Sequence, residues 1–273
     1  MIPKVIHYCW FGGKPLPELA IKCINSWKKY CPDYEIKEWN ENNFDICMCD
    51  YTKEAYKNEK WAFVSDYARF WILYNYGGIY FDTDVELLAH IDDLVEKGPF
   101  MGVEKPITYN EITKKYRLSV APGLGLAAYP NMDLYNQIIE QYHELSFVDK
   151  NGRLIQTTVV EIVSKILEKY QMIKIDDVRF LIEDVYIYKK DVFCPLDYFS
   201  GVLEITESTR SIHHYTASWQ SEEEKRNVEI FIKAKKKYGP ILGKFVGVVL
   251  TFKYRKIYEN IRETFIRKMR DKV

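Results

Sequence analysis

The sequence lacks any apolar run long enough to cross a bilayer. Its most apolar late stretch, the 12 residues 241–252, contains Lys244, whereas a membrane-spanning helix needs roughly 20 apolar residues. No signal-peptide pattern opens the chain, because Met1 runs almost directly into a strand pattern. The 39 lysines and arginines balance 39 acidic residues, so net charge gives no argument for nucleic acid as a partner. We therefore expect a cytoplasmic protein that binds no nucleic acid.

Cysteine is present without any spacing typical of a zinc site. Most of the six cysteines lie in otherwise apolar or helical surroundings, so reduced thiols in the cytosol fit better than disulfides; they are Cys9, Cys23, Cys31, Cys47, Cys49 and Cys194. Internal repeats and low-complexity linkers are lacking too. We predict one domain over residues 1–220, followed by a basic helical extension over residues 221–273.

The composition is that of a folded protein with a large share of aromatic side chains. Apolar residues make up 47% of the chain and charged residues 29%, which suits an α/β domain with a sizeable core. Aromatic residues make up 15%, including 22 tyrosines. Aromatic rings with polar edges are common where sugars and bases stack, and a tyrosine-rich core is the alternative.

Two acids follow a short buried strand in the first third of the sequence. Gly77 and Gly78 are suited to end the preceding helix, and the Ile-Tyr-Phe that follows favours a strand. Asp82 and Asp84 come next, and on a strand this spacing would put both carboxylates on one face. Adjacent carboxylates repel unless a cation lies between them, and Mg²⁺ or Mn²⁺ prefers oxygen ligands. The pattern predicts a metal–diphosphate site, with a polar turn as the alternative.

The first two predicted strands end in residues that suit nucleotide binding. Residues 5–10 form a strand-like run closed by a glycine turn, and α/β nucleotide-binding folds begin in this way. Trp10 lies at the carboxyl end of that run, where it would either stack on a base or belong to the core. Residues 34–39 alternate and predict the second strand. Asn40 opens the polar loop after it, where a base or ribose would be held.

The predicted helix before the acid pair carries a charged pair among aromatic side chains. Residues 60–76 place apolar side chains at helical spacing. Asp66 and Arg69 are three residues apart and therefore neighbours on one helix face. Because aromatic side chains surround them, they would bind sugar hydroxyls, and Arg69 would also lie close to phosphate. The alternative is a solvated ion pair that stabilises the helix by only about 0.3 kcal/mol.

The remaining chain alternates between helical and strand-like segments. We expect helices at residues 19–30, 90–95, 133–145 and 158–170, strands at 100–103, 118–129, 185–188 and 192–194, and a mobile loop at 104–117. Residues 211–219 predict a strand that ends in paired histidines followed by Ser-Trp. Histidine is a frequent ligand of Mn²⁺-type ions, and a core histidine with a backbone partner is the alternative.

The C-terminal segment is predicted to be helical and basic. From Lys233 to the end it holds 13 lysines and arginines against three acids. This composition is typical of an interfacial helix on an anionic membrane, and the alternative is a solvated helix packed on its own domain.

Together these motifs resemble the Asp-x-Asp sugar transferases of capsule and lipopolysaccharide synthesis. These mannosyl- and galactosyltransferases are related to the fungal initiating mannosyltransferase and, more distantly, to the glucosyltransferase domain of large bacterial toxins. The resemblance is strong over about residues 2–130 and returns at residues 211–219. It is carried by Ile2–Gly12, Ser65–Arg69, Tyr76–Glu86 and His214–Trp219.

The resemblance implies an α/β GT-A fold, which is Rossmann-like with a mixed central sheet, and a bound Mn²⁺ or Mg²⁺. It implies retaining transfer from a nucleoside-diphosphate sugar, a UDP-sugar before a GDP-sugar, to a hydroxyl of a glycan or lipid-linked oligosaccharide. The implied residues are Trp10, Asn40 and Tyr80 for the nucleotide, Asp66 and Arg69 for the donor sugar, Asp82 for ribose and metal, Asp84 and His214 for the metal, and Ser218 and Trp219 for closure over the diphosphate and sugar.

One departure from the family concerns the acceptor side. Many relatives carry Thr-Gly-Pro in mid-chain, where this sequence has Gln-Thr-Thr-Val from Gln156, which leaves Gln156 as a candidate for that face. The basic C-terminus suggests a lipid-linked acceptor, with the protein peripheral on the inner face of the cytoplasmic membrane.

Two rival functions fit parts of the sequence. A haloacid-dehalogenase-type phosphatase would use residues 81–85 as its nucleophile motif and Asp176-Asp177 as its late acid pair. That fold normally carries the motif on its first strand, whereas about eighty residues precede it here. A non-catalytic carbohydrate-binding protein would use the tyrosines and tryptophans and would need neither metal nor nucleotide.

Overall fold

The computed structural model describes residues 1–197, 201–216, 222–239, 242–243 and 245–251. The chain divides into two compact units, Met1–Leu196 with Leu203–Trp219, and Asp197–Val202 with Gln220–Val273. The predicted site residues Ser218 and Trp219 lie outside the described residues. The predicted boundary at residue 220 stays a prediction.

Among the described residues, the first unit contains the strands and every helix before residue 217. Its strands are β1 Val5–Cys9, β2 Glu35–Trp39, β3 Gly78–Tyr80, β4 Val85–Leu87, β5 Phe100–Gly102, β6 Thr108–Asn110, β7 Lys115–Arg117, β8 Leu126–Ala128, β9 Met172–Lys174, β10 Arg179–Ile182, β11 Val185–Tyr188 and β12 Ser211–His213. Its helices are α1 Glu18–Tyr30, the 3₁₀ turn η1 Ile46–Met48, α2 Asp50–Lys57, α3 Trp61–Tyr76, α4 Asp92–Val95, α5 Asp133–His143, α6 Val159–Leu167 and α7 Lys190–Phe193.

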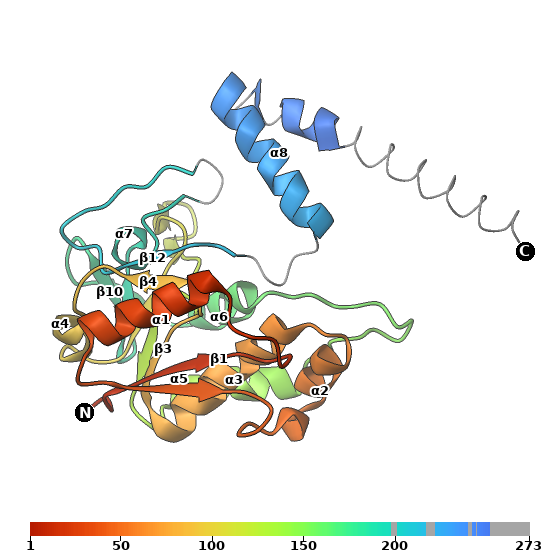
Figure 1. Cartoon of the computed structure of the whole chain (residues 1–273). Coiled ribbons are helices and arrows are strands. Elements are labelled where there is room, and N and C mark those ends of the chain that lie inside the picture. Colours follow the sequence, from red (N-terminus) through yellow and green to blue (C-terminus); the bar gives the residue numbers. More distant parts are fainter. Residues whose placement is uncertain (198–200, 217–221, 240–241, 244, 252–273) are drawn as a thin grey trace, which may run out of the picture. The chain divides into compact units, whose positions relative to one another are not determined.

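A mixed eight-stranded sheet forms the centre of this unit, in the order β2-β1-β3-β8-β5-β11-β10-β9 (Figure 1). β1 is parallel to β2 and β3, and β5 is parallel to β11. β8 is antiparallel to both β3 and β5. β2, β1, β3, β5 and β11 therefore point the same way, and their carboxyl ends share one edge of the sheet. Open α/β sheets bind ligands at this edge. The predicted α/β class with a mixed central sheet is confirmed.

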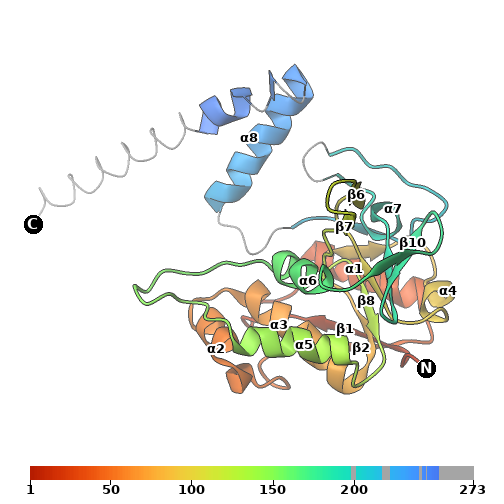
Figure 2. The same cartoon turned by 180° about the vertical axis from the view of Figure 1, so that it is seen from behind.

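Apolar side chains cover both faces of the sheet. Alternation around β3 sends Ile79 and Phe81 into one core cluster and Tyr80 into the other. The first cluster includes Trp27 of α1, and the second includes Phe70 of α3 together with buried residues of α5. Figure 1 shows α1 above β1 and β2, with α3 and α5 below, and Figure 2 shows the same layers from behind. The sheet therefore lies between helical layers.

Two short segments differ from the sequence prediction. Residues 192–194, predicted as a strand, fall largely within α7. Phe193 stacks on Phe100 with ring centroids 5.3 Å apart, so a helical turn buries this apolar run as well as a strand would. Periodicity cannot separate these cases in so short a run.

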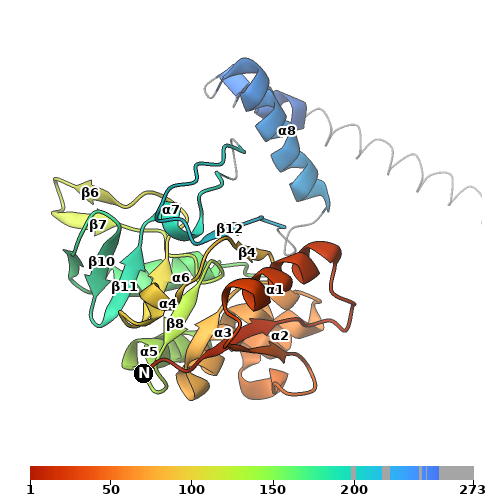
Figure 3. The same ribbon diagram turned by 60° about the vertical axis from the view of Figure 1, so that its left-hand side comes forward.

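The predicted loop over residues 104–117 contains the β6–β7 hairpin, which stands beside α7 in Figures 2 and 3. Tyr109 and Tyr116 face each other across it with ring centroids 4.9 Å apart. Aromatic cross-strand pairs of this kind stabilise a hairpin by up to about 1 kcal/mol.

A buried histidine closes the junction between α3 and β3. Gly78 has φ 95°, and a Cβ there would meet the carbonyl oxygen of Val5 and Nε2 of His7. Trp39 Nε1 donates to His7 Nδ1 at 3.1 Å, so His7 Nε2 carries the proton and donates to the Gly77 carbonyl oxygen at 3.1 Å. Burial lowers the pKa of His7 from 6.5 to about 4, although the hydrogen bond to Gly77 opposes the shift.

The second unit contains α8, Glu222–Tyr238 (Figure 1). Beyond α8, residues 245–251 are also helical. None of the helices within the described residues is both long and apolar enough to span a membrane.

We expect His7 to make the fold less stable in mild acid. The unfolded chain takes up the His7 proton near pH 6.5 and the folded protein only near pH 4, so stability falls as the pH falls through this window. The contribution reaches roughly 3 kcal/mol by pH 4. Urea unfolding at pH 7 and pH 5 should show a smaller loss for His7→Gln, whose amide keeps one donor and one acceptor without titrating. The exposed His90→Gln is the control, and an equal loss in wild type and His7→Gln would contradict the prediction.

Candidate functional site

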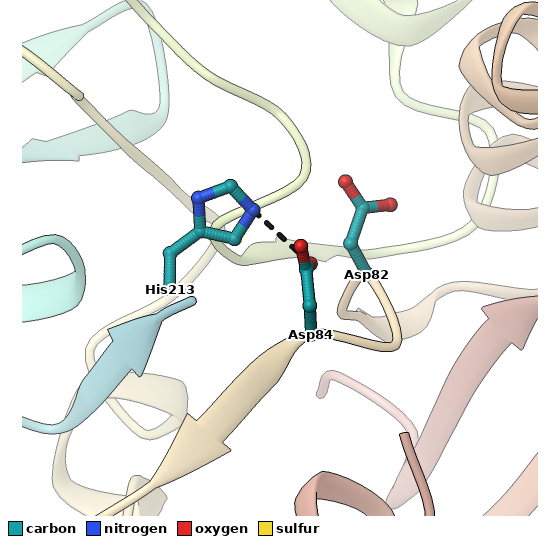
Figure 4. A group of neighbouring side chains, drawn as sticks. All are labelled: Asp82, Asp84 and His213. Carbon is teal, nitrogen blue, oxygen red and sulfur yellow. Dashed lines mark ion pairs between the residues drawn. The ribbon is translucent and has the colours of Figure 1, made fainter. Parts of the chain in front are cut away.

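Asp82 and Asp84 lie in the turn between β3 and β4. β3 ends at Tyr80 and β4 begins at Val85, whose N–H donates to the Asp82 carbonyl oxygen at 3.0 Å. The chain leaves the central sheet here because β4 pairs with β12 in a separate two-stranded sheet. The expectation that both acids share one face of a strand is therefore wrong. The turn nevertheless brings both carboxylates toward one point (Figure 4).

Arg69 joins the acid pair to the helix before it. Its Nη2 lies 2.9 Å from Asp66 Oδ1 and 3.2 Å from Asp82 Oδ1. Tyr80 Oη donates to Asp82 Oδ1 at 3.1 Å, and the Tyr80 ring centroid is 4.9 Å from the guanidinium carbon of Arg69. Four residues predicted from separate motifs, Asp66, Arg69, Tyr80 and Asp82, are thus joined in one network through Arg69.

This ion network is buried, so the alternative of a solvated pair on α3 is excluded. The Arg69 side chain is only 3% exposed. Burial raises the pKa of Asp66 to about 7 even though the Arg69 charge opposes the rise. Burial alone would lower the pKa of Arg69, but the charges of Asp82 and its neighbours raise it well above its usual value. Arg69 therefore stays charged.

Asp84 is held by His213 and Thr216, which come from the C-terminal segment of the first unit. His213 Nε2 lies 3.1 Å from Asp84 Oδ1. The backbone N–H and the hydroxyl of Thr216 both donate to Asp84 Oδ2, at 2.9 and 2.8 Å. Burial would raise the pKa of Asp84, but His213 and these hydrogen bonds hold it well below its usual range. The carboxylate keeps the pKa of His213 raised in turn, against the effect of burial.

The structure brings His213 to the acid pair, in the place expected for His214. His214 Nε2 lies 2.8 Å from Glu86 Oε2, which also accepts from Lys22 Nζ at 2.8 Å. His213 rather than His214 contacts Asp84 because β12 pairs with β4. In that pairing His213 stands opposite Val85, the residue directly after Asp84. Sequence alone does not give this register, so it could not distinguish the two neighbouring histidines.

Asp82, Asp84 and His213 form a donor set that suits a divalent cation. One possible ligand atom from each lies within 4.8 Å of the others (Figure 4). This separation is slightly more than two metal–ligand bonds of about 2.1 Å, so a small rotation of the partly exposed Asp82 would close it. Two carboxylates and an imidazole are ligands that Mn²⁺ accepts. The chemistry of the residues fits the predicted metal.

Gly123 is a site residue to which sequence reasoning gave no role. It lies in residues 118–125, which are irregular although a strand was predicted there. Its carbonyl oxygen accepts from the Asp82 N–H at 3.0 Å. A Cβ at Gly123 would overlap the Asp82 carboxylate and lie 3.3 Å from Arg69 Nη1. Glycine is therefore required if Asp82 is to keep this orientation.

Trp10 and Asn40 follow β1 and β2, at the same sheet edge as the acid pair. Trp10 is half-buried, and its Nε1 donates to the Lys14 carbonyl oxygen at 2.6 Å. The Asn40 side chain donates to Glu38 Oε1 at 2.7 Å. Gln156 is exposed in the connection between α5 and α6. The nucleotide roles of Trp10 and Asn40 and the acceptor role of Gln156 stay predictions.

The acids that a phosphatase would need lie elsewhere. Asp176 and Asp177 occupy the turn between β9 and β10, the last two strands in the order of the sheet. Asp176 pairs with Arg179 at 2.7 Å and Asp177 with Lys174 at 2.9 Å. These contacts engage both acids locally, which counts against the phosphatase.

Comparison with known families identifies the segment that carries the acids. Residues 17–101 match the family described as "Glycosyltransferase sugar-binding region containing DXD motif". We refer to this matched segment as the DXD region. The DXD region holds Asp66, Arg69, Asp82 and Asp84, whereas His213 comes from beyond it.

Two curated proteins of Schizosaccharomyces pombe (strain 972 / ATCC 24843) are similar to part of the chain. Inositol phosphoceramide mannosyltransferase 1 is 30% identical over 121 residues, which is 40% of this chain and 36% of that protein. Inositol phosphoceramide mannosyltransferase 3 is 31% identical over 102 residues, which is 34% of this chain and 27% of that protein. The chain thus spans about a third of the length of these relatives.

Among solved structures, the PaToxG glycosyltransferase aligns with a TM-score of 0.42 and 19% identity. The alignment covers 62% of this chain and 69% of that chain.

We expect Gly123→Ala to weaken metal binding while leaving the fold intact. The new methyl group would push the Asp82 carboxylate out of its position, and displaced ligands typically cost about 10- to 100-fold in metal affinity. Titration calorimetry with Mn²⁺ measures the affinity, and circular dichroism checks the fold. Gly125→Ala is the matched control, because its Cβ would meet the edge of Phe81 at 3.1 Å and no acid of the site. Equal Mn²⁺ affinity in wild type and Gly123→Ala would contradict the assigned geometry.

Proposed function

We propose that this protein is a metal-dependent glycosyltransferase that moves a sugar from a nucleoside-diphosphate sugar to a hydroxyl of a glycan or lipid-linked acceptor. The observation that carries the proposal is the convergence of Asp66, Arg69 and Asp82 with Asp84 and His213 in and around a DXD region. The mixed α/β sheet, with the acids at the carboxyl ends of its parallel strands, is compatible with the GT-A fold of such enzymes.

Each side chain has a role that follows from its surroundings. Asp82, Asp84 and His213 would hold Mn²⁺ or Mg²⁺, which when bound neutralises charge on the diphosphate leaving group. Arg69 is buried and permanently charged, so it can stabilise the same charge without being reorganised. Asp66 is positioned by Arg69 to accept hydrogen bonds from hydroxyls of the donor sugar. Trp10 and Asn40 would hold the base and ribose at the neighbouring strand ends.

The reaction we propose is a front-face substitution that retains anomeric configuration. The bond between the anomeric carbon and the phosphate oxygen breaks, and a bond to the acceptor oxygen forms on the same face. The acceptor proton passes to an oxygen of the departing phosphate, so no protein nucleophile is needed. The first sugar to test is mannose, because both curated relatives are named mannosyltransferases.

A nucleotide sugar should stabilise the protein only with a divalent metal. A ligand at 100 times its Kd adds about 2.7 kcal/mol to the free energy of unfolding. We expect at least one of GDP-mannose, UDP-galactose and UDP-glucose to raise the melting temperature with Mn²⁺, and Asp84→Asn to abolish the rise. Asp177→Asn, which changes an exposed aspartate that pairs with Lys174, is the matched control.

The two rival functions make different predictions. A lectin should ignore all three nucleotide sugars, and a phosphatase should release p-nitrophenol from p-nitrophenyl phosphate with Mg²⁺. Either result, or a full thermal response in Asp84→Asn, would overturn the proposal.

We also propose that the C-terminal unit attaches the enzyme to an anionic membrane surface from the cytoplasmic side. Large apolar side chains are exposed beyond α8, with Leu242 58%, Phe245 75% and Val249 56% accessible. They lie in the part of the sequence that holds 13 basic residues against three acids. An exposed apolar helix face combined with positive charge is the chemistry that binds anionic bilayers. Such attachment would suit a lipid-linked acceptor.

The full chain should therefore sediment with vesicles that contain phosphatidylglycerol and not with pure phosphatidylcholine. Raising the salt concentration should release it, because the charges would be screened. The double variant Phe245→Glu with Val249→Glu should stay in the supernatant. Ile21→Glu, which changes an exposed apolar residue of α1, should sediment like the wild type. Sedimentation of the double variant at the wild-type level would contradict the membrane proposal.

A further inference from the structure

A cavity of about 310 Å³ lies at the same sheet edge as the acid pair, between the base of the β6–β7 hairpin and α7. Pro106 and Ile107 line it from the hairpin side, and Lys189, Asp191 and Pro195 from α7 and its flanks. Figures 2 and 3 both show the hairpin beside α7. The cavity does not include any residue assigned above to the metal or the donor.

The strand order puts this cavity on the side of the acid pair away from Trp10 and Asn40. Those two residues follow β1 and β2, and the acid pair follows β3. The cavity is lined by residues that follow β5 and β11, the next strands in the sheet that point the same way. A donor whose base lies at Trp10 and whose diphosphate lies at the acid pair would place its sugar nearest this side of the sheet. An acceptor on this side would reach that sugar without passing the nucleotide.

Direct contacts link the cavity wall to the acid pair. His213, which pairs with Asp84, lies against Tyr215 with ring centroids 4.3 Å apart. Tyr215 Oη is 2.7 Å from Cys194 Sγ, and Pro195 of the cavity follows Cys194 directly. The cavity is thus a neighbour of the metal ligands.

The lining suits a neutral sugar. Two prolines and an isoleucine offer apolar surface for the C–H face of a pyranose ring. The carboxylates of Asp191 and Glu204 are acceptors for hydroxyl groups, and the two lysines of the lining balance their charge, which gives no preference for an anion. A volume of about 310 Å³ is at the small end of ligand sites, large enough for a terminal monosaccharide and too small for a long glycan.

We infer that this cavity is the acceptor subsite and takes the neutral terminal sugar whose hydroxyl receives the transferred group. The inference rests on the proposed glycosyltransferase function. It gives the acceptor-side role to Ile107, Asp191 and Glu204, and not to Gln156, which is exposed between α5 and α6.

The test measures nucleotide release from the donor with and without methyl α-mannoside, methyl β-galactoside and methyl α-glucoside as acceptors. In the wild type at least one glycoside should stimulate release above the rate with water alone. Glu204→Ala should raise the KM for that glycoside about tenfold, because a hydrogen bond to a charged group is lost. Ile107→Trp, which fills the cavity, should abolish the stimulation. Both variants should keep the Mn²⁺-dependent thermal shift with the donor, which shows that they are folded and bind it.

Glu207→Ala is the matched control, because it removes an exposed glutamate of the same segment that does not line the cavity. It should keep the wild-type KM. A wild-type enzyme that releases nucleotide but responds to no glycoside, or whose stimulation survives both cavity variants unchanged, overturns the acceptor subsite alone. A wild type that shows neither nucleotide release nor a donor-dependent thermal shift would instead remove the proposed function on which the inference rests.

Discussion

The site depends on one buried positive charge. Asp66 is buried and Asp82 is partly exposed, and the buried Arg69 contacts both, at 2.9 and 3.2 Å. Two carboxylates without such a partner would repel each other or take up protons. The guanidinium is itself held, since its Nε donates to the Ser65 carbonyl oxygen at 3.1 Å and its plane contacts the Tyr80 ring. The helix and the acid turn are therefore fixed relative to each other.

Close backbone approach makes this arrangement possible. Gly78 lets β3 pass against β1 at the Val5 carbonyl oxygen, and Gly123 leaves room for the Asp82 carboxylate. Both glycines act by lacking a Cβ where another group already lies. The His7 ring, buried and neutral, joins Trp39 of β2 to the Gly77 carbonyl oxygen at the start of β3. One buried ring thus ties β1, the end of β2 and the start of β3 together.

The candidate metal ligands come from two distant parts of the chain. Asp82 and Asp84 are fixed by the turn after β3, whereas His213 and Thr216 reach them only because β12 pairs with β4. Beyond Asp84 the same segment continues through Tyr215 toward Cys194 and the cavity beside α7. A single segment of chain therefore contacts both the metal ligands and the surface where we place the acceptor. Donor and acceptor sides would be coupled through these contacts.

The local sequence pattern was sufficient to predict the helices and strands that bury a continuous apolar stripe. α1, α3, β1, β2 and β11 form where spacing predicts them, because each element's own side chains decide which face it buries. The Asp66–Arg69 pair and the acid pair could also be singled out, since both follow from spacing within one short segment. The family resemblance added the expectation that they meet.

Where contacts between residues far apart in the chain decide the local structure, the sequence was not sufficient to predict it. Val192 and Phe193 form part of a helix because Phe193 packs on Phe100, and the acids lie in a turn because β4 has its partner in β12. The same pairing selects His213 over its neighbour, and the fit of Gly123 against Asp82 exists only once both segments are folded. The sequence by itself thus determined most helices and strands of the sheet and singled out the Asp66–Arg69 pair and the acid pair, because helical and strand periodicity and short spacings are local properties. Only the tertiary structure decided which of them meet, because strand register and close packing depend on residues far apart in the chain.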